Sequence, residues 1–517
     1  MNRPDGARLY GIMSWDTGNQ EEAMTQRQDR NDDTGAGALR AGIARSDITT
    51  SDEGVVVHDP LYAKALVLDD GDTTVVIIAM DVVAIGGIGD VSDDFLPELR
   101  SRIEGELRIP GGNVLVNASH THPPGRLLCD DAEQLARTFD AVSRAVKNMA
   151  PVRAGTGIGY EDRITINRTL RLKNGKGWTI RQAHPCPPDE EVAGLGPIDP
   201  EIGILRIDRL DGRPLAVVYN FACHPLIGVP GGAVTANFPG FASNVIEQNL
   251  GEGAMALFLQ GAGGDVTEVL YKDVNRPRDS EPIGTMLGLS TLKALRDIRT
   301  TDATLSVASE TVALPRRTDI PERLEALQQE QAELLATLSS TSLSFKAFLP
   351  LYIKYALSAD YPSDYSYRYL HAEQVGTNEL TELDKWNRQN IAKYLSNIQA
   401  MEKLARIQSD MATLRWHKAF NDASGEATIA AEVQGIRIGD CLLITSPAEV
   451  LTEVALNVKQ ASPHKHTFVA AFSNGYVHYG APVGDYDMGG YEVTECLLAP
   501  EWQQVYEEAA ARVLSRL

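Results

Sequence analysis

The sequence predicts an α/β protein whose mixed, largely buried β-sheet core is flanked by helices and interrupted by a helical insertion. Short apolar runs rich in β-branched residues recur along the chain, as buried strands do. Helical patterns separate many of these runs, an alternation typical of α/β folds. A hydrophobic share of 43% over 517 residues is enough to form a large core.

The expected strands and helices cover most of the chain beyond residue 42. The strands span 73–80, 113–117, 215–219, 254–259, 441–445 and 467–472, and the helices span 93–106, 130–148, 241–249 and 285–299. Two further helices are expected at 321–338, where leucines fall near one stripe and Pro321 suits the first turn, and at 379–414. Eight aromatic residues lie between them, at 345–369. We expect a helical insertion at about 320–420, acting either as a lid or acyl-binding wall or as ordinary helix packing.

Composition argues against several function classes. The net charge of −22 disfavours nucleic acid or an anionic membrane as the main partner. No apolar run is long enough to span a bilayer, so no stable membrane insertion is expected. Because the first residues do not resemble a secretory signal, the expected location is the cytoplasm. The five cysteines contain no CxxC pair, which disfavours both a disulfide framework and a cysteine-built zinc site.

Polar residues capable of chemistry follow almost every expected core strand. Ligand sites in open α/β sheets gather beyond the carboxyl ends of the strands, so these residues are candidates for one cleft. The six contributors are Asp81, the segment 119–122, His224, the glycine-rich stretch 261–265, Glu449 and the segment 473–476.

Three of these contributors carry side chains that bind metals. His120 and His122 alternate along an extended segment, so both imidazoles can face one side. Imidazole is the commonest metal ligand, and zinc accepts mixed nitrogen and oxygen donors. Each residue also has a structural interpretation. His120, His122 and His224 can be structural histidines whose ring nitrogens have hydrogen-bond partners, and Glu449 can be the end of a capping box that begins at Ser446.

Two other segments bear on catalysis. The stretch 261–265 lacks the ending of a nucleotide loop, so it is either a plain tight turn or a source of amides for an oxyanion. Arg168 follows a strand-like run, and it either binds a carboxylate or polarised carbonyl or forms a surface salt bridge. A serine elbow of the Gly-x-Ser-x-Gly type is absent.

In order, the motifs of this chain resemble those of the neutral/alkaline (non-lysosomal) ceramidases, in their N-terminal catalytic domain. The likeness spans about 40–315 and 430–495, and the chain looks like a divergent member. It rests on the segments 41–49, His58 with 61–65, 119–122 (SHTH), 166–169 (INRT), 220–225 (NFACHP), 264–266 (GDV), 447–449 (PAE) and the late series Tyr476, Tyr479, Tyr486 and Tyr491-Glu492.

The resemblance implies a hydrolase that holds one Zn²⁺ per chain and cleaves an N-acyl amide. The implied metal ligands are His120, His224, Glu449 and Tyr476, and the implied catalytic residues are His122, Arg168 and Tyr486. A further set, Gly264, Asp265 and Thr267, is expected to form an oxyanion or substrate loop. The implied domain plan is a flexible N-terminal arm at 1–38 and one catalytic domain at 39–517, without the C-terminal β-sandwich of the family.

Departures from the family pattern bear on the substrate. Pro123–Arg126 replace the usual Ser-Gly-Pro-Gly, and Thr267–Val269 replace Ser-Pro-Asn. We therefore expect a small or soluble amide rather than ceramide. A zinc esterase or lactonase using the same site, and a non-catalytic binding protein that retains the fold, are the alternatives. The oligomeric state is left open, with a homo-oligomer among the possibilities.

Overall fold

An eight-stranded mixed sheet forms the centre of the protein in a computed structural model, which describes residues 38–122, 127–181, 186–251, 253–272 and 275–517. The strand order is β12-β11-β10-β5-β1-β2-β3-β4, and only the outermost pairs, β3 with β4 and β11 with β12, are parallel. The strands are β1 (Arg40–Asp47), β2 (Tyr62–Asp69), β3 (Thr74–Met80), β4 (Val114–Ala118), β5 (Ala150–Tyr160), β10 (Glu201–Arg209), β11 (Pro214–Phe221) and β12 (Met255–Gln260).

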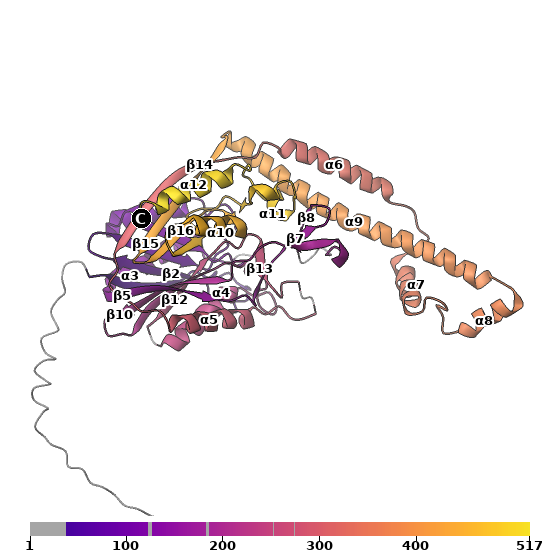
Figure 1. The fold of residues 1–517 in the computed structure, drawn as a ribbon, viewed down its shortest axis with the longest axis horizontal. Coiled ribbons are helices and arrows are strands. Elements are labelled where there is room, and N and C mark those ends of the chain that lie inside the picture. Colours follow the sequence, from indigo (N-terminus) through magenta and orange to yellow (C-terminus); the bar gives the residue numbers. More distant parts are fainter. Residues whose placement is uncertain (1–37, 123–126, 182–185, 252, 273–274) are drawn as a thin grey trace, which may run out of the picture.

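A second, four-stranded sheet packs face to face on the first (Figure 1). Alternate residues divide each strand between two cores: Leu66 and Leu68 of β2 face the second sheet, whereas Ala65 and Val67 face helices. The second sheet contains β14 (Leu305–Pro315), β15 (Thr428–Ile438), β16 (Cys441–Thr445) and β18 (His466–Ala470). Because strands buried on both faces are apolar throughout, β3 and β16 were recognisable as continuous apolar runs.

Helices cover both outer faces, so the body has four layers. The first sheet is covered by α2 (Phe95–Leu107), α3 (Asp131–Lys147), α4 (Asn237–Leu250) and α5 (Glu281–Leu295), and the second by α10 (Thr452–Ala461) and α12 (Trp502–Leu514). These strands and helices confirm the predicted fold class, a mixed α/β core flanked by helices.

The two edge strands of the large sheet meet at their carboxyl ends. The Gln260 amide, at the end of β12, donates to Asn117 Oδ1 of β4 at 2.8 Å. The Asn117 side chain in turn donates to the Ala471 carbonyl at 2.6 Å and to Ser473 Oγ at 2.9 Å, just beyond β18. This buried asparagine therefore brings the ends of three strands, from both sheets, to one place.

Small sheets surround this meeting point. They are β13 (Val266–Glu268) with β6 (Thr165–Asn167), β17 (Glu449–Val450) with β19 (Tyr479–Gly480), and the trio β7 (Thr169–Leu172), β8 (Gly177–Thr179) and β9 (Val192–Leu195). The short helix α11 (Tyr491–Thr494) follows.

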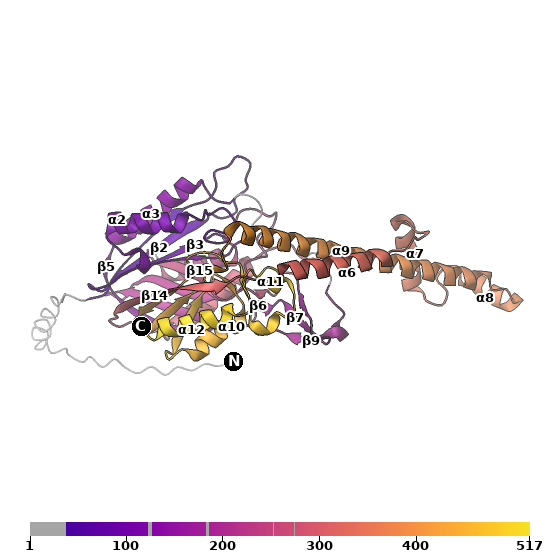
Figure 2. The ribbon, with the colours of Figure 1, turned by 90° about the horizontal axis from the view of Figure 1, so that it is seen from above.

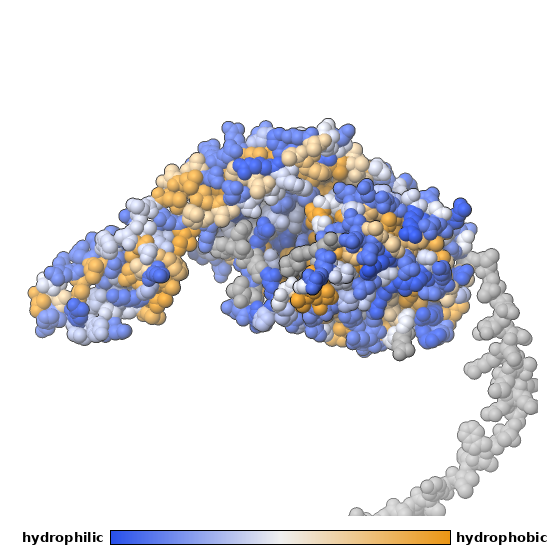
Figure 3. All heavy atoms as spheres, turned by 180° about the vertical axis from the view of Figure 1, so that it is seen from behind, coloured by the Kyte–Doolittle hydropathy of each residue, from blue (hydrophilic) through white to orange (hydrophobic). Residues whose placement is uncertain are grey.

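A helical projection, residues 320–424, extends from the body between β14 and β15 (Figures 1 and 2). It contains α6 (Ile320–Thr337), α7 (Phe345–Leu357), α8 (Ser366–Val375) and the 46-residue α9 (Glu379–Ser424). The helices expected at 321–338 and 379–414 correspond to α6 and α9. Apolar patches lie along the projection (Figure 3), whose exposed side chains include Phe345, Leu357 and Trp386.

No helix among the described residues has the length and apolar character needed to cross a bilayer. Two segments lie outside the described residues: 1–37 of the expected N-terminal arm, and 123–126, where the sequence differs from the family motif. The division of the chain into an arm and one catalytic domain stays a prediction.

Candidate metal centre

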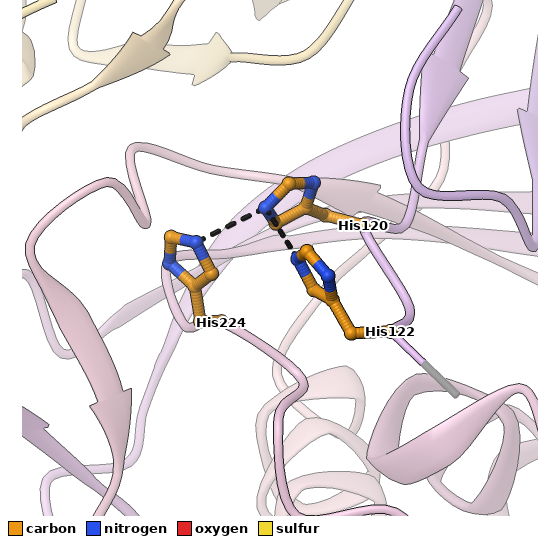
Figure 4. A group of neighbouring side chains, drawn as sticks. All are labelled: His120, His122 and His224. Carbon is orange, nitrogen blue, oxygen red and sulfur yellow. Dashed lines mark hydrogen bonds between the residues drawn. The ribbon is translucent and has the colours of Figure 1, made fainter. Parts of the chain in front are cut away.

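His120 and His224 meet at the carboxyl ends of β4 and β11, with their Nε2 atoms 3.0 Å apart (Figure 4). Both rings are buried. His120 adopts a left-handed backbone conformation with φ of 66°, which is uncommon for a residue with a side chain. Its amide donates to the Val82 carbonyl at 2.8 Å, so the neighbouring β3 loop holds this conformation. Non-glycine residues in this strained region cluster at functional sites.

The hydrogen bonds of the two rings fix which nitrogen carries the proton. His120 Nδ1 lies 2.6 Å from the Val83 carbonyl, and His224 Nδ1 contacts the Gly263 carbonyl. A carbonyl only accepts, so each Nδ1 carries a hydrogen and each Nε2 of a neutral ring presents a lone pair. Burial lowers the pKa of His224 to about 3, which keeps this ring neutral near pH 7. A neutral His224 therefore directs the lone pair of its Nε2 at His120 Nε2.

Glu449 completes this arrangement from β17, a short strand that follows β16 of the second sheet. Its Oε2 lies 3.2 Å from His224 Nε2 and 3.5 Å from His120 Nε2, and it is buried without a hydrogen-bond donor from any residue that the structure describes. Glu449 belongs to β17, and α10 begins only at Thr452. The capping-box alternative for Glu449 is therefore wrong, because the residue pairs in a strand with Tyr479 instead of closing a helix start.

The three donors have the spacing of one metal site. Zinc bonds of about 2.0–2.2 Å in a tetrahedron separate neighbouring ligands by roughly 3.3–3.6 Å. The three separations observed here, 3.0, 3.2 and 3.5 Å, lie close to that range. A cation between the donors would also remove the repulsion among two lone pairs and a buried carboxylate oxygen.

His122 adds a third imidazole to this cluster, with its Nε2 2.9 Å from His120 Nε2. One potential ligand atom from each of His120, His122 and His224 lies within 4.8 Å of the other two. Unlike the other two, His122 is exposed to solvent. The geometry accommodates it either as a further ligand or as a group that exchanges protons with water.

Two of the late tyrosines contact the metal-binding cluster, whereas Tyr486 does not. Tyr476 donates its hydroxyl hydrogen bond to Glu449 Oε1. The ring of Tyr479 stacks on His224 with centroids 6.4 Å apart. The Tyr486 hydroxyl donates to the Leu498 carbonyl at 2.8 Å, and none of its hydrogen bonds or ring contacts among the described residues reaches the histidines. The catalytic role expected of Tyr486 stays a prediction.

Arg168 is buried beside Tyr479. Its Nε donates to Glu492 at 2.8 Å, and its Nη2 donates to the Tyr479 hydroxyl at 2.8 Å and to the Gly264 carbonyl at 2.7 Å. Burial opposes the charge, but the adjacent Tyr479 and Glu492 raise the pKa of Arg168 above its ordinary value. The surface salt-bridge alternative is therefore wrong, because this guanidinium is buried and positions Tyr479.

The glycine-rich loop supports the ligands through its hydrogen bonds. The Gly264 amide donates to the Val450 carbonyl at 3.0 Å, next to Glu449. Asp265 accepts from Thr452 and Asn167, and Thr267 forms a parallel bridge with His224. The loop thus aligns His224 with Glu449, while its expected oxyanion or substrate role stays a prediction.

A cavity of about 280 Å³ opens beside His122. Its lining is mainly apolar and includes Val82, Val83, Ile88, Leu127 and Leu128. Asp90 also lines it, and its carboxylate already accepts the amides of Leu127 and Leu128. His122 is the one member of the histidine cluster that lines this cavity among the described residues.

No family model and no curated protein sequence matches this chain. Solved structures do match it. The fold resembles that of a neutral ceramidase. The crystal structure of neutral ceramidase from Pseudomonas aeruginosa aligns with a TM-score of 0.57 and 15% identity, over 93% of this chain and 75% of that chain. A ceramidase complexed with C2 aligns with a TM-score of 0.57 and 15% identity, over 93% of this chain and 76% of that chain. At this identity the likeness establishes a shared fold.

Within this ceramidase-like fold, the structure adds two residues that sequence reasoning did not assign. Tyr479 belongs to the late tyrosine series, but the sequence did not distinguish it from Tyr486. Glu492 follows Tyr491, and its carboxylate accepts from Arg168 and from Thr179 Oγ1 at 2.5 Å. Tyr479 and Glu492 both belong to the late series on which the family resemblance rests, but that resemblance assigned neither of them a role.

Proposed function

We propose that this protein is a zinc-dependent hydrolase that cleaves an amide (N-acyl) C–N bond. The observation that carries the proposal is the convergence of the Nε2 atoms of two buried histidines on a buried carboxylate oxygen that has no hydrogen-bond donor among the described residues. Such a set is expected to bind a cation, and two histidines with one glutamate are a known catalytic zinc set. The resemblance of the fold to neutral ceramidase supports the amide as the target.

His120, His224 and Glu449 would hold the zinc, with Tyr476 beside them through its hydrogen bond to Glu449. When bound, zinc supplies Lewis acidity and activates water near neutral pH. The carbonyls of Val83 and Gly263 orient the two imidazoles by accepting from Nδ1, as outer partners do at metal sites.

Two other residues are placed to handle charge and protons. His122, exposed and adjacent to His120, can take a proton from water and deliver it to the departing amine nitrogen. Tyr479 accepts a hydrogen bond from Arg168, so its own hydroxyl hydrogen is available to an oxyanion. Burial keeps the pKa of Tyr479 above its ordinary value, so this hydroxyl stays a donor at neutral pH.

The cavity beside His122 supports a small or soluble amide rather than ceramide. Its volume of about 280 Å³ is at the lower end for small-molecule sites, which run from about 300 to 1,000 Å³. Ceramide carries two long alkyl chains, far more than this space accepts. We also propose the cytoplasm as the location, since all five cysteines are free thiols.

Metal content and turnover test this proposal together. The purified full-length protein should contain about one zinc at the site of His224, and His224→Gln should lose both that zinc and turnover. His371→Gln, an exposed histidine on α8, is the matched control and should retain both. Full turnover after His224→Gln or after exhaustive chelation would contradict the proposal.

Substrate pairs separate the amidase from the esterase alternative. Short N-acyl amines and the corresponding acyl esters would be compared by kcat/KM on the same preparation, with a long-chain ceramide as a third substrate. We expect turnover of the amide, and little of the ceramide. Hydrolysis of the ester alone would favour an esterase or lactonase, and absence of turnover with zinc bound would favour a binding protein.

A further inference from the structure

A second group of metal-binding side chains lies at the base of the helical projection. His417 comes from α9, His478 precedes β19, and Glu495 follows α11. One potential ligand atom from each lies within 4.8 Å of the other two. The three residues therefore join the projection to the segment that also carries Tyr476 and Glu492.

Among the residues that the structure describes, neither ring nitrogen of His417 has a hydrogen-bond partner, although its relative exposure is 0%. Buried polar groups almost always have a partner, and leaving one without is costly. The nearest carboxylate oxygen, Glu495 Oε2, lies 4.0 Å from His417 Nε2, too far for a hydrogen bond. Tetrahedral zinc ligands lie roughly 3.3–3.6 Å apart, so these two atoms need to approach each other by less than about 1 Å to share an ion.

The other two members are held in place as ligands usually are. Glu495 Oε1 accepts a hydrogen bond from Thr413 Oγ1 at 3.0 Å, which leaves Oε2 directed to His417. His478 adopts a left-handed backbone with φ of 60°, a strained state for histidine, and its ring lies 5.4 Å from that of His417. Aromatic packing alone explains the contact of the rings, but it leaves both nitrogens of His417 without a partner.

We propose that His417, His478 and Glu495 form a second site for a divalent transition metal such as zinc. Two imidazoles and one carboxylate are donors that zinc, cobalt and nickel accept. The ion would fasten the base of α9 to the strand segment behind the primary centre, so its role would be to hold the projection in position. This site is independent of the hydrolase proposal, because none of its donors belongs to the primary ligand set.

Cobalt binding to a variant without the primary site tests the proposal. The full-length double variant His224→Gln, Glu449→Gln would be titrated with Co²⁺, followed by visible absorption and by tryptophan fluorescence. Trp416 is the expected reporter, because its ring lies 5.3 Å from that of His417 and 5.0 Å from that of His478. We expect about one equivalent of tightly bound Co²⁺ and quenching that Trp416→Phe abolishes.

Adding His417→Gln should abolish this binding, whereas adding His371→Gln should leave it unchanged. If the His417 variant does not fold, Glu495→Gln serves instead, since Glu495 is partly exposed and the change keeps its size; cobalt affinity should then fall at least tenfold. Absence of cobalt binding in the double variant would overturn the proposal, and so would binding that survives either substitution. Because no turnover is measured, the result does not depend on the hydrolase activity.

Discussion

Replacing Glu449 with glutamine should change protein stability in opposite directions with and without zinc. Without the metal, Glu449 Oε2 is a buried carboxylate oxygen with no donor in the described part of the chain, and such a group costs about 1–3 kcal/mol or more. A glutamine amide at this position can donate to His224 Nε2, 3.2 Å away, while its oxygen still accepts from Tyr476. We therefore expect Glu449→Gln to raise the free energy of unfolding of the metal-free protein by about 2 kcal/mol.

With excess zinc, the same substitution removes a charged ligand. A thousandfold loss of zinc affinity would remove about 4.1 kcal/mol of stabilisation. That loss exceeds the gain of the metal-free protein, so the net free energy of unfolding should fall by about 2 kcal/mol. The reversal arises only if a cation is what compensates the carboxylate.

Urea unfolding followed by tryptophan fluorescence at pH 8, in a chelator and in excess zinc, measures both values. At this pH His224 is neutral, because burial lowers its pKa to about 3. Glu453→Gln, at an exposed carboxylate, is the control and should shift neither value by more than about 0.5 kcal/mol. If Glu449→Gln destabilised the protein in the chelator as well, Glu449 would have a partner without metal, and the reasoning would be refuted.

Three further substitutions test the surroundings of the centre. His122→Gln should keep the zinc but lower kcat about 10²–10⁴-fold, measured by elemental analysis and single-turnover kinetics; loss of zinc would make His122 a ligand instead. Burial raises the pKa of Glu268 to about 7, so its contribution to stability is present at low pH and lost as the pH rises from about 4.3 through 7. The free energy of unfolding of Glu268→Gln, measured in urea, should therefore exceed that of the parent protein by roughly 3 kcal/mol at pH 8 and by much less at pH 5. A difference that does not change with pH would contradict this. Gly264→Ala would place a Cβ 2.6 Å from the Glu449 carbonyl, so it should cost about 1–3 kcal/mol and weaken zinc binding, whereas Gly484→Ala, with open space, should do neither.

Much of the body was predictable because its buried strands are continuous apolar runs in the sequence. The strand expected at 441–445 is β16 without change, and that expected at 73–80 differs from β3 by one residue. Such strands are apolar throughout since they are covered on both faces. The same apolar runs predicted the positions of His120 and His224, because each histidine follows shortly after the end of one.

The pairing of the edge strands was not predictable in this way. Nothing in the residues of β4 and β12 indicates that Asn117 links their ends, because this contact depends on the curvature of the whole sheet. Glu449 carried a misleading local signal, since its spacing from Ser446 matches a capping box. His417 lies in a helix of 46 residues, where one buried histidine does not break the helical pattern.

The place where the helical projection leaves the body has a consequence for the order of folding. Strands β14 and β15 are direct antiparallel partners, with Pro315 opposite Thr428, so residues 316–427 form the loop of a hairpin. Closing so long a flexible loop costs roughly 4 kcal/mol of chain entropy before any strand pairing is gained. Helices form from local contacts, and pairing of α6 with α9 brings the two ends of this loop together first. We therefore expect the projection to form first and to align β14 with β15, so that the sheet whose strand β16 leads into Glu449 assembles on it.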